Sequence, residues 1–316
     1  MPHRYPAICL MGPTASGKSQ IAVELALKFN CEIVSVDSAL VYRGMDIGTA
    51  KPSIEERKGV PHYLIDILDQ AEFFSTGLFR RNALESIRRI HEQGKTPLLV
   101  GGTMLYFRSL LQGLAPLPEA NHEIRAEIEY EAMRVGWPKM HGQLASVDPV
   151  SAARIHPNDP QRIQRAIEVF RITGKSLTEI CGTEQAKDIP FFPIKLKIVP
   201  SDRAKLHRRI EARFRGMIES GLLGEVEKMI QRGDLNVTHP SVRAVGYRQA
   251  WAHLHGEIDR ETMIAKGIAA TRQLAKRQLT WLNKESASFL YNRGCVNLDA
   301  VISADVEPLL RSWNQS

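Results

Sequence analysis

Short apolar runs alternate with amphipathic stretches near the N-terminus, and apolar runs return after residue 190. The runs that predict buried strands are AICLM (7–11), CEIVSVDS (31–38), HYLIDIL (62–68), TPLLVGGTMLY (96–106), IKLKIVP (194–200) and ASFLYN (287–292). Between them, apolar residues recur at helical spacing from Ile21 to Phe29, and the stretch 79–94 is an amphipathic helix that Gly94 ends. Strands that alternate with helices predict an α/β fold, a parallel sheet with helices on both faces.

The pattern changes between residues 121 and 189, where strand signals vanish. Helical stretches such as EIRAEIEYEAMRVG and PQRIQRAIEVFRITG dominate this part of the chain. We therefore predict two domains. The α/β core is formed by residues 1–120 and 190–316 and includes further helices near its C-terminal end, and residues 121–189 form an all-helical insertion.

A glycine-rich loop, GPTASGKS, follows the first predicted strand and opens the first predicted helix, which is the context of a P-loop. The backbone N–H groups of such a loop point inward, and the positive end of the helix faces the same ligand. Lys18 adds a full charge, and the Ser19 hydroxyl is placed to hold Mg²⁺. A chance glycine turn is the less favoured alternative. The residues assigned to the phosphate chain are Gly12, Pro13, Thr14, Ala15, Ser16, Gly17, Lys18 and Ser19.

The loop alone indicates a diphosphate or triphosphate and leaves the reaction open. Hydrolases and kinases of this class place a metal-linked Asp on a later apolar strand. Here the best candidate strand, in PLLVGGTMLY, ends in Gly101, Gly102 and Thr103 and carries no Asp. The Thr103 hydroxyl can donate to a phosphate oxygen but cannot act as a carboxylate base. This weakens the hypothesis of a small-molecule kinase, which stays an alternative.

Asp37 directly follows the second predicted strand. Ligands of open parallel sheets bind in the crevice beyond the carboxyl ends of the strands, so this carboxylate is a candidate for chemistry. The alternative is an N-cap for the following turn, a frequent use of Asp. The residues alone favour both interpretations about equally.

Composition narrows the class of protein. The chain has 316 residues, is 43% hydrophobic and 24% charged, and carries a formal charge of +7, so it is globular and suited to polyanionic partners. Its four cysteines, Cys9, Cys31, Cys181 and Cys295, form no CxxC pair, which argues against structural zinc and favours a reducing compartment. No apolar run is long enough to span a membrane, so we expect a cytoplasmic protein.

Cations are concentrated in four segments, 154–171, 201–221, 243–251 and 271–284, and the third combines arginines with a tyrosine and a tryptophan. Any one such segment is most simply a solvated helix face. Several of them beside a phosphate loop favour an RNA-sized anion, because cations neutralise phosphates and aromatic faces stack on unpaired bases.

The motifs, taken in order, resemble the bacterial tRNA dimethylallyltransferases of the IPP transferase family. The resemblance is carried by GPTASGKS, SVDSALVYRGMDIGTAKP, LLVGGTMLY, HPNDPQRIQRAIEV, VGYRQ and TRQLAKRQLTWL, and it runs from Ile8 to Trp281. Two positions differ from the common pattern: Ser19 stands where Thr is frequent, and Leu40 where many members carry Gln. The resemblance implies a P-loop NTPase-like core.

The resemblance also implies a reaction and its cofactor. The dimethylallyl group of dimethylallyl diphosphate moves to N6 of the adenosine just 3′ of the anticodon, diphosphate leaves, and Mg²⁺ assists. The loop then cradles the leaving diphosphate. Asp37 orients or deprotonates the amine, and Thr103, Lys18 and Arg213, chosen over Arg215, stabilise the departing charge.

By the same resemblance, the partner is the anticodon stem-loop of tRNA, gripped in part by the helical insertion, and we expect the enzyme to act as a monomer. The positions it implies for tRNA contact are Asp37, Ser38, Ala39, Leu40, Thr103, Arg125, Gln161, Arg162, Ile163, Gln164, Arg165, Arg243, Ala244, Val245, Gly246, Tyr247, Arg248, Lys276, Arg277, Gln278, Leu279, Thr280, Trp281, Leu282 and Asn283. A kinase of a small metabolite and a non-catalytic RNA-binding protein are the competing hypotheses.

Overall fold

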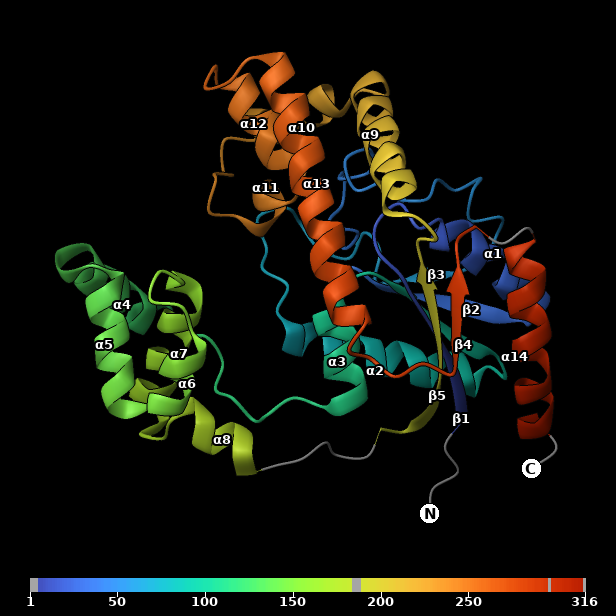
Figure 1. The fold of residues 1–316 in the computed structure, drawn as a ribbon, viewed down its shortest axis with the longest axis horizontal. Helices are drawn as coiled ribbons and strands as arrows, with labels where there is room; N and C mark the ends of the chain where they lie inside the picture. The colour runs from blue at the N-terminus through green and yellow to red at the C-terminus, as the bar shows by residue number, and fades with distance from the viewer. Residues whose placement is uncertain (1–4, 184–188, 295–296, 315–316) are drawn as a thin grey trace. The chain divides into compact units, whose positions relative to one another are not determined.

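The computed structural model describes residues 5–183, 189–294 and 297–314. The chain separates into two compact units, one made of residues 1–111 together with 190–316 and the other of residues 112–189 (Figure 1). The second unit is helical, and it begins at Gln112, the last residue of the helix Met104–Gln112, ahead of the helix that starts at His122.

The first unit is built on six parallel strands in the order β3-β2-β4-β1-β5-β6. Their bounds are β1 Tyr5–Met11, β2 Cys31–Val36, β3 His62–Tyr63, β4 Thr96–Gly101, β5 Phe191–Val199 and β6 Phe289–Asn292. The predicted α/β class with a P-loop-like parallel sheet is confirmed. The helices of this unit are α1 Lys18–Lys28, α2 Thr76–Glu92, α3 Met104–Gln112, α9 Arg203–Glu219, α10 Leu222–Gln231, α11 Pro240–Arg243, α12 Tyr247–Leu254, α13 Arg260–Leu282 and α14 Leu298–Asn314.

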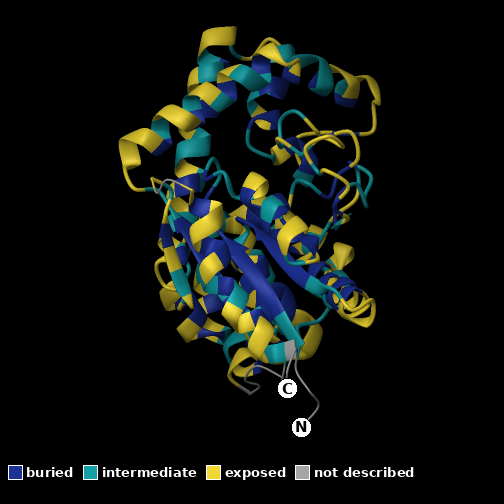
Figure 2. Cartoon of the chain, turned by 90° about the vertical axis from the view of Figure 1, so that its right-hand side faces the viewer, coloured by how far each residue is buried: buried dark blue, intermediate teal, exposed yellow. Residues whose placement is uncertain are grey.

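Successive residues of strand β1 point to opposite faces of the sheet, because a strand is pleated. Ile8 and Leu10 belong to one apolar cluster with residues of α1 and α14. Helix α2 contacts β2 and β4, and its buried Phe79 and Ile87 lie outside that cluster. The strands are the most deeply buried part of the unit (Figure 2).

Two of the apolar runs form strands that are shorter than the run itself. Only His62 and Tyr63 of the run HYLIDIL pair with β2, because Leu64 and Asp66 adopt positive φ and turn the chain away from the sheet. The run TPLLVGGTMLY ends as a strand at Gly101, and its last three residues begin α3. The expected extent of the run at 62–68 was therefore wrong, whereas the strand at 96–101 ends at the Gly-Gly turn that its sequence predicts.

The helices after β5 share a second apolar core with the segment that follows β2. Val41, Tyr42 and Met45 of that segment pack with Phe214 of α9 and with residues of α10 to α13. Helices α9 and α13 approach closely at Gly267, where an added Cβ would lie 2.1 Å from the Phe214 ring. A larger residue at this position would therefore displace the Phe214 ring or the helices that carry the two residues.

The second unit has its own core. Its helices are α4 His122–Val135, α5 Trp137–Val147, α6 Pro149–Arg154, α7 Pro160–Thr173 and α8 Leu177–Thr183. Ile128, Met140, Leu144 and Ile163 are fully buried within it. Side chains cap its helices: Asn121 accepts from the first turn of α4, and Asp148 and Asp159 cap α6 and α7.

Candidate active site

Three adjacent strand ends form the floor of the site. Strand β4 lies between β1 and β2, and Gly101 pairs with both Met11 and Val36, so the three strands end at one level. The phosphate loop follows β1, Asp37 follows β2, and the Gly-Gly-Thr turn follows β4. An added Cβ at Gly101 would lie 2.0 Å from the Val36 carbonyl oxygen, so glycine is what lets these ends approach.

The phosphate loop is a strained, compact turn. Ala15 and Gly17 have φ of +60° and +77°, and Gly17 caps the N-terminus of α1 without a side-chain bond. The Ser16 hydroxyl is buried and has no partner among the described residues. An orphaned buried hydroxyl, together with helix N–H groups that lack a capping side chain, is suited to phosphate oxygens.

Two of the loop amides are already engaged. The Thr14 N–H donates to Gln278 Oε1 at 2.8 Å, and the Ser16 N–H donates to the Pro13 carbonyl at 3.3 Å. The Lys18 ammonium also donates to the Pro13 carbonyl, at 3.3 Å. An anion in this loop would therefore meet fewer backbone donors than the sequence suggests, and would depend more on side chains.

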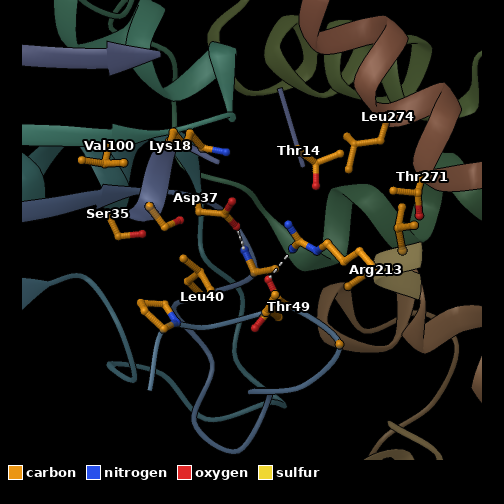
Figure 3. A pocket seen from close by; sticks show the side chains of 18 of the residues that line it. Thr14, Lys18, Ser35, Asp37, Leu40, Thr49, Val100, Arg213, Thr271 and Leu274 are labelled. Atoms are coloured by element: carbon orange, nitrogen blue, oxygen red, sulfur yellow. Dashed lines mark hydrogen bonds between the residues drawn. The ribbon is translucent and has the colours of Figure 1, made fainter. Parts of the chain in front are cut away.

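Lys18, Ser19, Asp37 and Arg213 line one pocket, with Asp37 on one side and Arg213 on the other (Figure 3). Burial lowers the pKa of Lys18 to about 8; Asp37 opposes this shift and Arg213 reinforces it, so the three charges sense one another. Burial likewise lowers the pKa of Arg213, and Asp37 counteracts it. The pocket thus holds two cations and one carboxylate.

The depressed pKa of Lys18 leads to a pH prediction. Above about pH 8 the free protein loses the Lys18 ammonium, and with it affinity for a diphosphate. We expect kcat/KM for the donor to fall above pH 8 by up to tenfold per pH unit, whereas kcat holds to higher pH because a bound anion keeps the lysine protonated. Lys18→Arg should remove this decline; a wild-type kcat/KM that stays flat to pH 9.5 would contradict the assignment.

The Asp37 carboxylate accepts a hydrogen bond from the Ala39 N–H at 2.9 Å. It therefore acts in a local turn and also lines the pocket, so the two interpretations of this residue are compatible. The next residue is tied down as well, because the Ser38 N–H donates to Thr103 Oγ1 at 3.2 Å. Thr103 thus links the end of β2 to the end of β4.

Arg213 is held in the pocket by the loop after β2. Its guanidinium donates to the Thr49 carbonyl at 3.2 Å. Glu225 of α10 fixes that loop: its carboxylate accepts from the N–H groups of Asp46, Ile47 and Gly48 at 2.8, 2.9 and 3.1 Å. By contrast, Arg215 is exposed and pairs with Glu211 on the same helix. The structure thus brings Arg213, and not Arg215, to the pocket.

Glu225 also accepts a hydrogen bond from the buried Tyr247 hydroxyl. Glu225→Ala leaves three backbone N–H groups without an acceptor, and we expect it to lower the free energy of unfolding by about 2–4 kcal/mol. Urea unfolding measures the change. Glu227→Ala, on an exposed position of the same helix, is the matched control; equal midpoints for the two variants would contradict the role of Glu225.

The positions expected to contact tRNA fall into three groups by exposure. Exposed are Ser38, Gln161, Arg162, Arg243, Arg248, Lys276, Arg277, Thr280 and Asn283. Partly buried are Asp37, Ala39, Leu40, Thr103, Arg125, Gln164, Arg165, Ala244, Val245, Gln278, Leu279 and Trp281. Buried are Ile163, Gly246, Tyr247 and Leu282. Of these, Ile163 and Tyr247 belong to the apolar cores, and Gly246 has no side chain with which to contact RNA.

Two arginines of the helical unit are engaged with a buried carboxylate. Arg125 donates to both oxygens of Glu168, at 2.9 and 3.1 Å, and Arg165 donates to it at 2.7 Å. Burial favours a raised pKa for Glu168, but the hydrogen bonds from both arginines and the Asn121 amide outweigh it, so the pKa lies below its usual value. Arg162, in contrast, is 71% exposed, and its ion pair with Asp159, at 3.5 Å on the same helix end, lies at the surface.

Glu225 and the bridging role of Gln278 were not predicted. Both depend on contacts between residues far apart in the sequence, 177 positions for Glu225 and Gly48 and 264 for Gln278 and Thr14. No local spacing signals such contacts. Cys9, Cys31 and Cys181 are free thiols, and Cys295 lies outside the described residues.

A six-stranded parallel sheet whose first strand leads into a GxxxxGKS loop and a helix defines a P-loop α/β protein. A sequence model of the IPP transferase family matches residues 40–285. The tRNA dimethylallyltransferase of Methylococcus capsulatus is 55% identical over 305 residues, 96% of this chain and 98% of the relative. The chain belongs to the IPP transferase family.

Two solved structures share the fold. The full-length tRNA isopentenylpyrophosphate transferase of Bacillus halodurans aligns with a TM-score of 0.72 and 34% identity, covering 99% of this chain and 98% of that one. A eukaryotic dimethylallyltransferase described as acting on tRNA aligns with a TM-score of 0.79 and 26% identity, covering 96% of this chain and 77% of that one.

Along the described residues, no helix combines the length and apolar character needed to cross a bilayer.

Proposed function

We propose that this chain transfers the dimethylallyl group of dimethylallyl diphosphate to N6 of the adenosine immediately 3′ of the anticodon in tRNA, and releases diphosphate. The observation that carries the proposal is the placement of Lys18 and Arg213 in one pocket with the Asp37 carboxylate. Cations suit a departing diphosphate, and a carboxylate suits an amine that must lose a proton. Relatives named as tRNA dimethylallyltransferases favour this reaction over a small-molecule kinase.

The donor half of the site stabilises charge. An allylic diphosphate ionises when the negative charge on its bridging oxygen is stabilised by preorganised donors. The ammonium of Lys18 and the guanidinium of Arg213 line the pocket and supply those donors, with the remaining loop amides. The buried Ser16 hydroxyl, which has no partner among the described residues, is a further donor in the same loop. Thr103 stands at the adjoining turn. Its oxygen accepts from the Ser38 N–H, which leaves the hydroxyl hydrogen to donate to the diphosphate.

The acceptor half prepares the nucleophile. The exocyclic amine of adenine is a weak nucleophile, because its lone pair is delocalised into the ring. A carboxylate within hydrogen-bond reach orients that N–H and takes its proton as the new C–N bond forms. Asp37 fills this role, held at the end of β2 by the Ala39 amide. The base must leave its stack to enter the pocket, which costs a few kcal/mol that tRNA contacts offset.

We propose that Mg²⁺ accompanies the diphosphate, and the residues present fit it. The Ser19 hydroxyl is exposed and lines the pocket. No cluster of three or more His, Cys, Asp or Glu side chains that could hold a metal occurs within the described ranges. Mg²⁺ commonly binds through few protein ligands plus substrate phosphates and water. When bound, it would neutralise phosphate charge.

The exposed cations supply the tRNA surface in this proposal. Lys276 and Arg277 stand on α13, Arg243 and Arg248 flank the start of α12, and Arg162 stands on α7 of the helical unit. Phosphate contacts of this kind bind in a salt-dependent way and carry little sequence information. We further propose that the protein works as a cytoplasmic monomer.

Arg162→Ala should weaken tRNA binding and lower the slope of log K against log salt concentration by about 1, because one phosphate contact is lost. Filter binding over a salt series measures it. Arg171→Ala is the matched control, since Arg171 stands on the same helix and is paired with Glu127 and Glu131. If Arg162→Ala and Arg171→Ala lowered the slope equally, a phosphate contact at Arg162 would be contradicted.

One assay tests the proposed reaction against its rivals. Protein, Mg²⁺ and unmodified tRNA are incubated with labelled dimethylallyl diphosphate, with and without ATP. Label in tRNA without ATP supports the transferase. ATP consumption with a small acceptor supports a kinase, and tRNA binding without any label supports a non-catalytic RNA-binding protein. Absence of label with a substrate tRNA rejects the proposal.

A further inference from the structure

Gln278 joins two loops of the pocket and is distant in sequence from both, by 264 positions from Thr14 and by 176 from Gly102. It stands on α13 with its side chain partly buried. Its Oε1 accepts from the Thr14 N–H of the phosphate loop at 2.8 Å, and its Nε2 donates to the Gly102 carbonyl after β4 at 2.9 Å. One side-chain amide thus ties the end of β1 to the end of β4.

The chemistry of the bridge requires a primary amide. Thr14 offers a donor and Gly102 offers an acceptor, so the bridging group needs an oxygen on one side and an N–H on the other. Glutamate could accept from Thr14 but would turn an oxygen toward the Gly102 carbonyl. Gly102 fits the bridge in turn, because an added Cβ there would lie 2.5 Å from Nε2.

The bridge continues to the carboxylate. Gly102 precedes Thr103, whose Oγ1 accepts from the N–H of Ser38, the residue after Asp37. A continuous path of hydrogen bonds and short backbone segments therefore runs from the phosphate loop through Gln278 to Asp37. Its two ends are the group that would hold the leaving diphosphate and the group that would hold the amine.

We propose that Gln278 is a positioning residue that sets the separation between the phosphate loop and the Asp37 segment. The proposal rests on the proposed function. Gln278 lines the same pocket as Lys18 and Asp37, and it holds the phosphate loop in place through the Thr14 N–H. Its role here is therefore to hold the reacting groups in register and not to contact tRNA phosphates. Misplacement of reacting groups by about 1 Å costs about 10²-fold in rate.

The test combines three variants with two measurements. Gln278→Ala removes both hydrogen bonds, Gln278→Glu keeps only the bond from Thr14, and Gln273→Ala changes an exposed glutamine of the same helix as the matched control. The measurements are the single-turnover rate of prenyl transfer at saturating substrates and the affinity for inorganic diphosphate by calorimetry. We expect rates about 100-fold lower for Gln278→Ala, about tenfold lower for Gln278→Glu, and unchanged for Gln273→Ala.

A double-mutant cycle separates positioning from general destabilisation. In an Asp37→Asn background, Gln278→Ala should slow the reaction by less than about threefold, because no carboxylate is left to misplace. Equal losses in both backgrounds, or a Gln278→Ala rate equal to that of Gln273→Ala, would overturn the proposal. If the wild type labels no tRNA, the proposed function fails. The diphosphate measurement then still tests the bridge: affinity about tenfold lower in Gln278→Ala supports it, and unchanged affinity rejects it.

Discussion

Asp37→Asn should lower the rate of prenyl transfer by about 10²- to 10⁴-fold, the contribution of a positioned general base. The substitution is nearly isosteric. The asparagine Oδ1 can still accept from the Ala39 N–H, so the turn at the end of β2 persists. What disappears is the negative charge that aligns the amine and accepts its proton. The single-turnover rate at saturating donor and tRNA measures the loss.

Binding measurements must show that Asp37→Asn still binds tRNA and diphosphate. We expect affinities for tRNA and for inorganic diphosphate within about threefold of wild type, since phosphate contacts dominate both. Asp202→Asn is the matched control, because Asp202 caps α9 and asparagine caps a helix about as well. A wild-type rate in Asp37→Asn would remove the carboxylate from the mechanism.

Lys18→Ala should lower the chemical step by about 10²- to 10³-fold, the usual loss when one preorganised donor to a developing negative charge is removed. The ammonium lies in the pocket with Asp37 and Arg213, where burial strengthens its interaction with an anion. The affinity for tRNA should change far less than the rate. Rapid-quench measurement of product formation, beside a tRNA binding curve, gives both quantities.

Lys28→Ala provides the control for Lys18→Ala, because Lys28 ends the same helix and is half exposed in an ion pair with Glu307. It should leave the rate and the tRNA affinity unchanged. If Lys18→Ala abolished tRNA binding and spared the rate of bound complexes, the diphosphate would have been assigned to the wrong place.

Local patterns allowed much of the fold to be predicted. Strand β1 and the loop after it are encoded by an apolar run and a fixed glycine spacing, and both occur where expected. The run at 62–68 was predicted as a full strand on its hydrophobicity. The positive φ of Leu64 and Asp66 ends it early, and the rest forms a loop bonded to residues 40–41. Apolar character alone does not separate a buried strand from a buried loop.

The site was less predictable than the fold. Asp37 was selected by its position after a predicted strand and by the resemblance, and Arg213 by motif alone. The structure places both in the pocket with Lys18. Arg125 and Arg165 were selected by the same means, yet both are bonded to Glu168. Whether a cation faces solvent or a buried acid depends on the packing of α4 against α7, which a charge pattern along one helix does not report.

The internal use of cations changes how the positive charge of the chain should be counted. Lys51 is bonded to Asp46 and Asp66 with its side chain only 3% exposed. Lys197 donates to the Leu282 carbonyl at the end of α13 and to the Glu285 carbonyl just beyond it. With Arg125 and Arg165, these residues are among the 42 lysines and arginines of the chain. Asp46, Asp66 and Glu168 cancel three of these four charges in the net total, so the number of cations overstates the charge that is free for a polyanion. Because they are bonded inside the protein, they neutralise few phosphates of a polyanion and release few of its condensed counterions. The electrolyte sensitivity of RNA association is therefore governed by the cations that remain hydrated, and estimates from composition will be too steep.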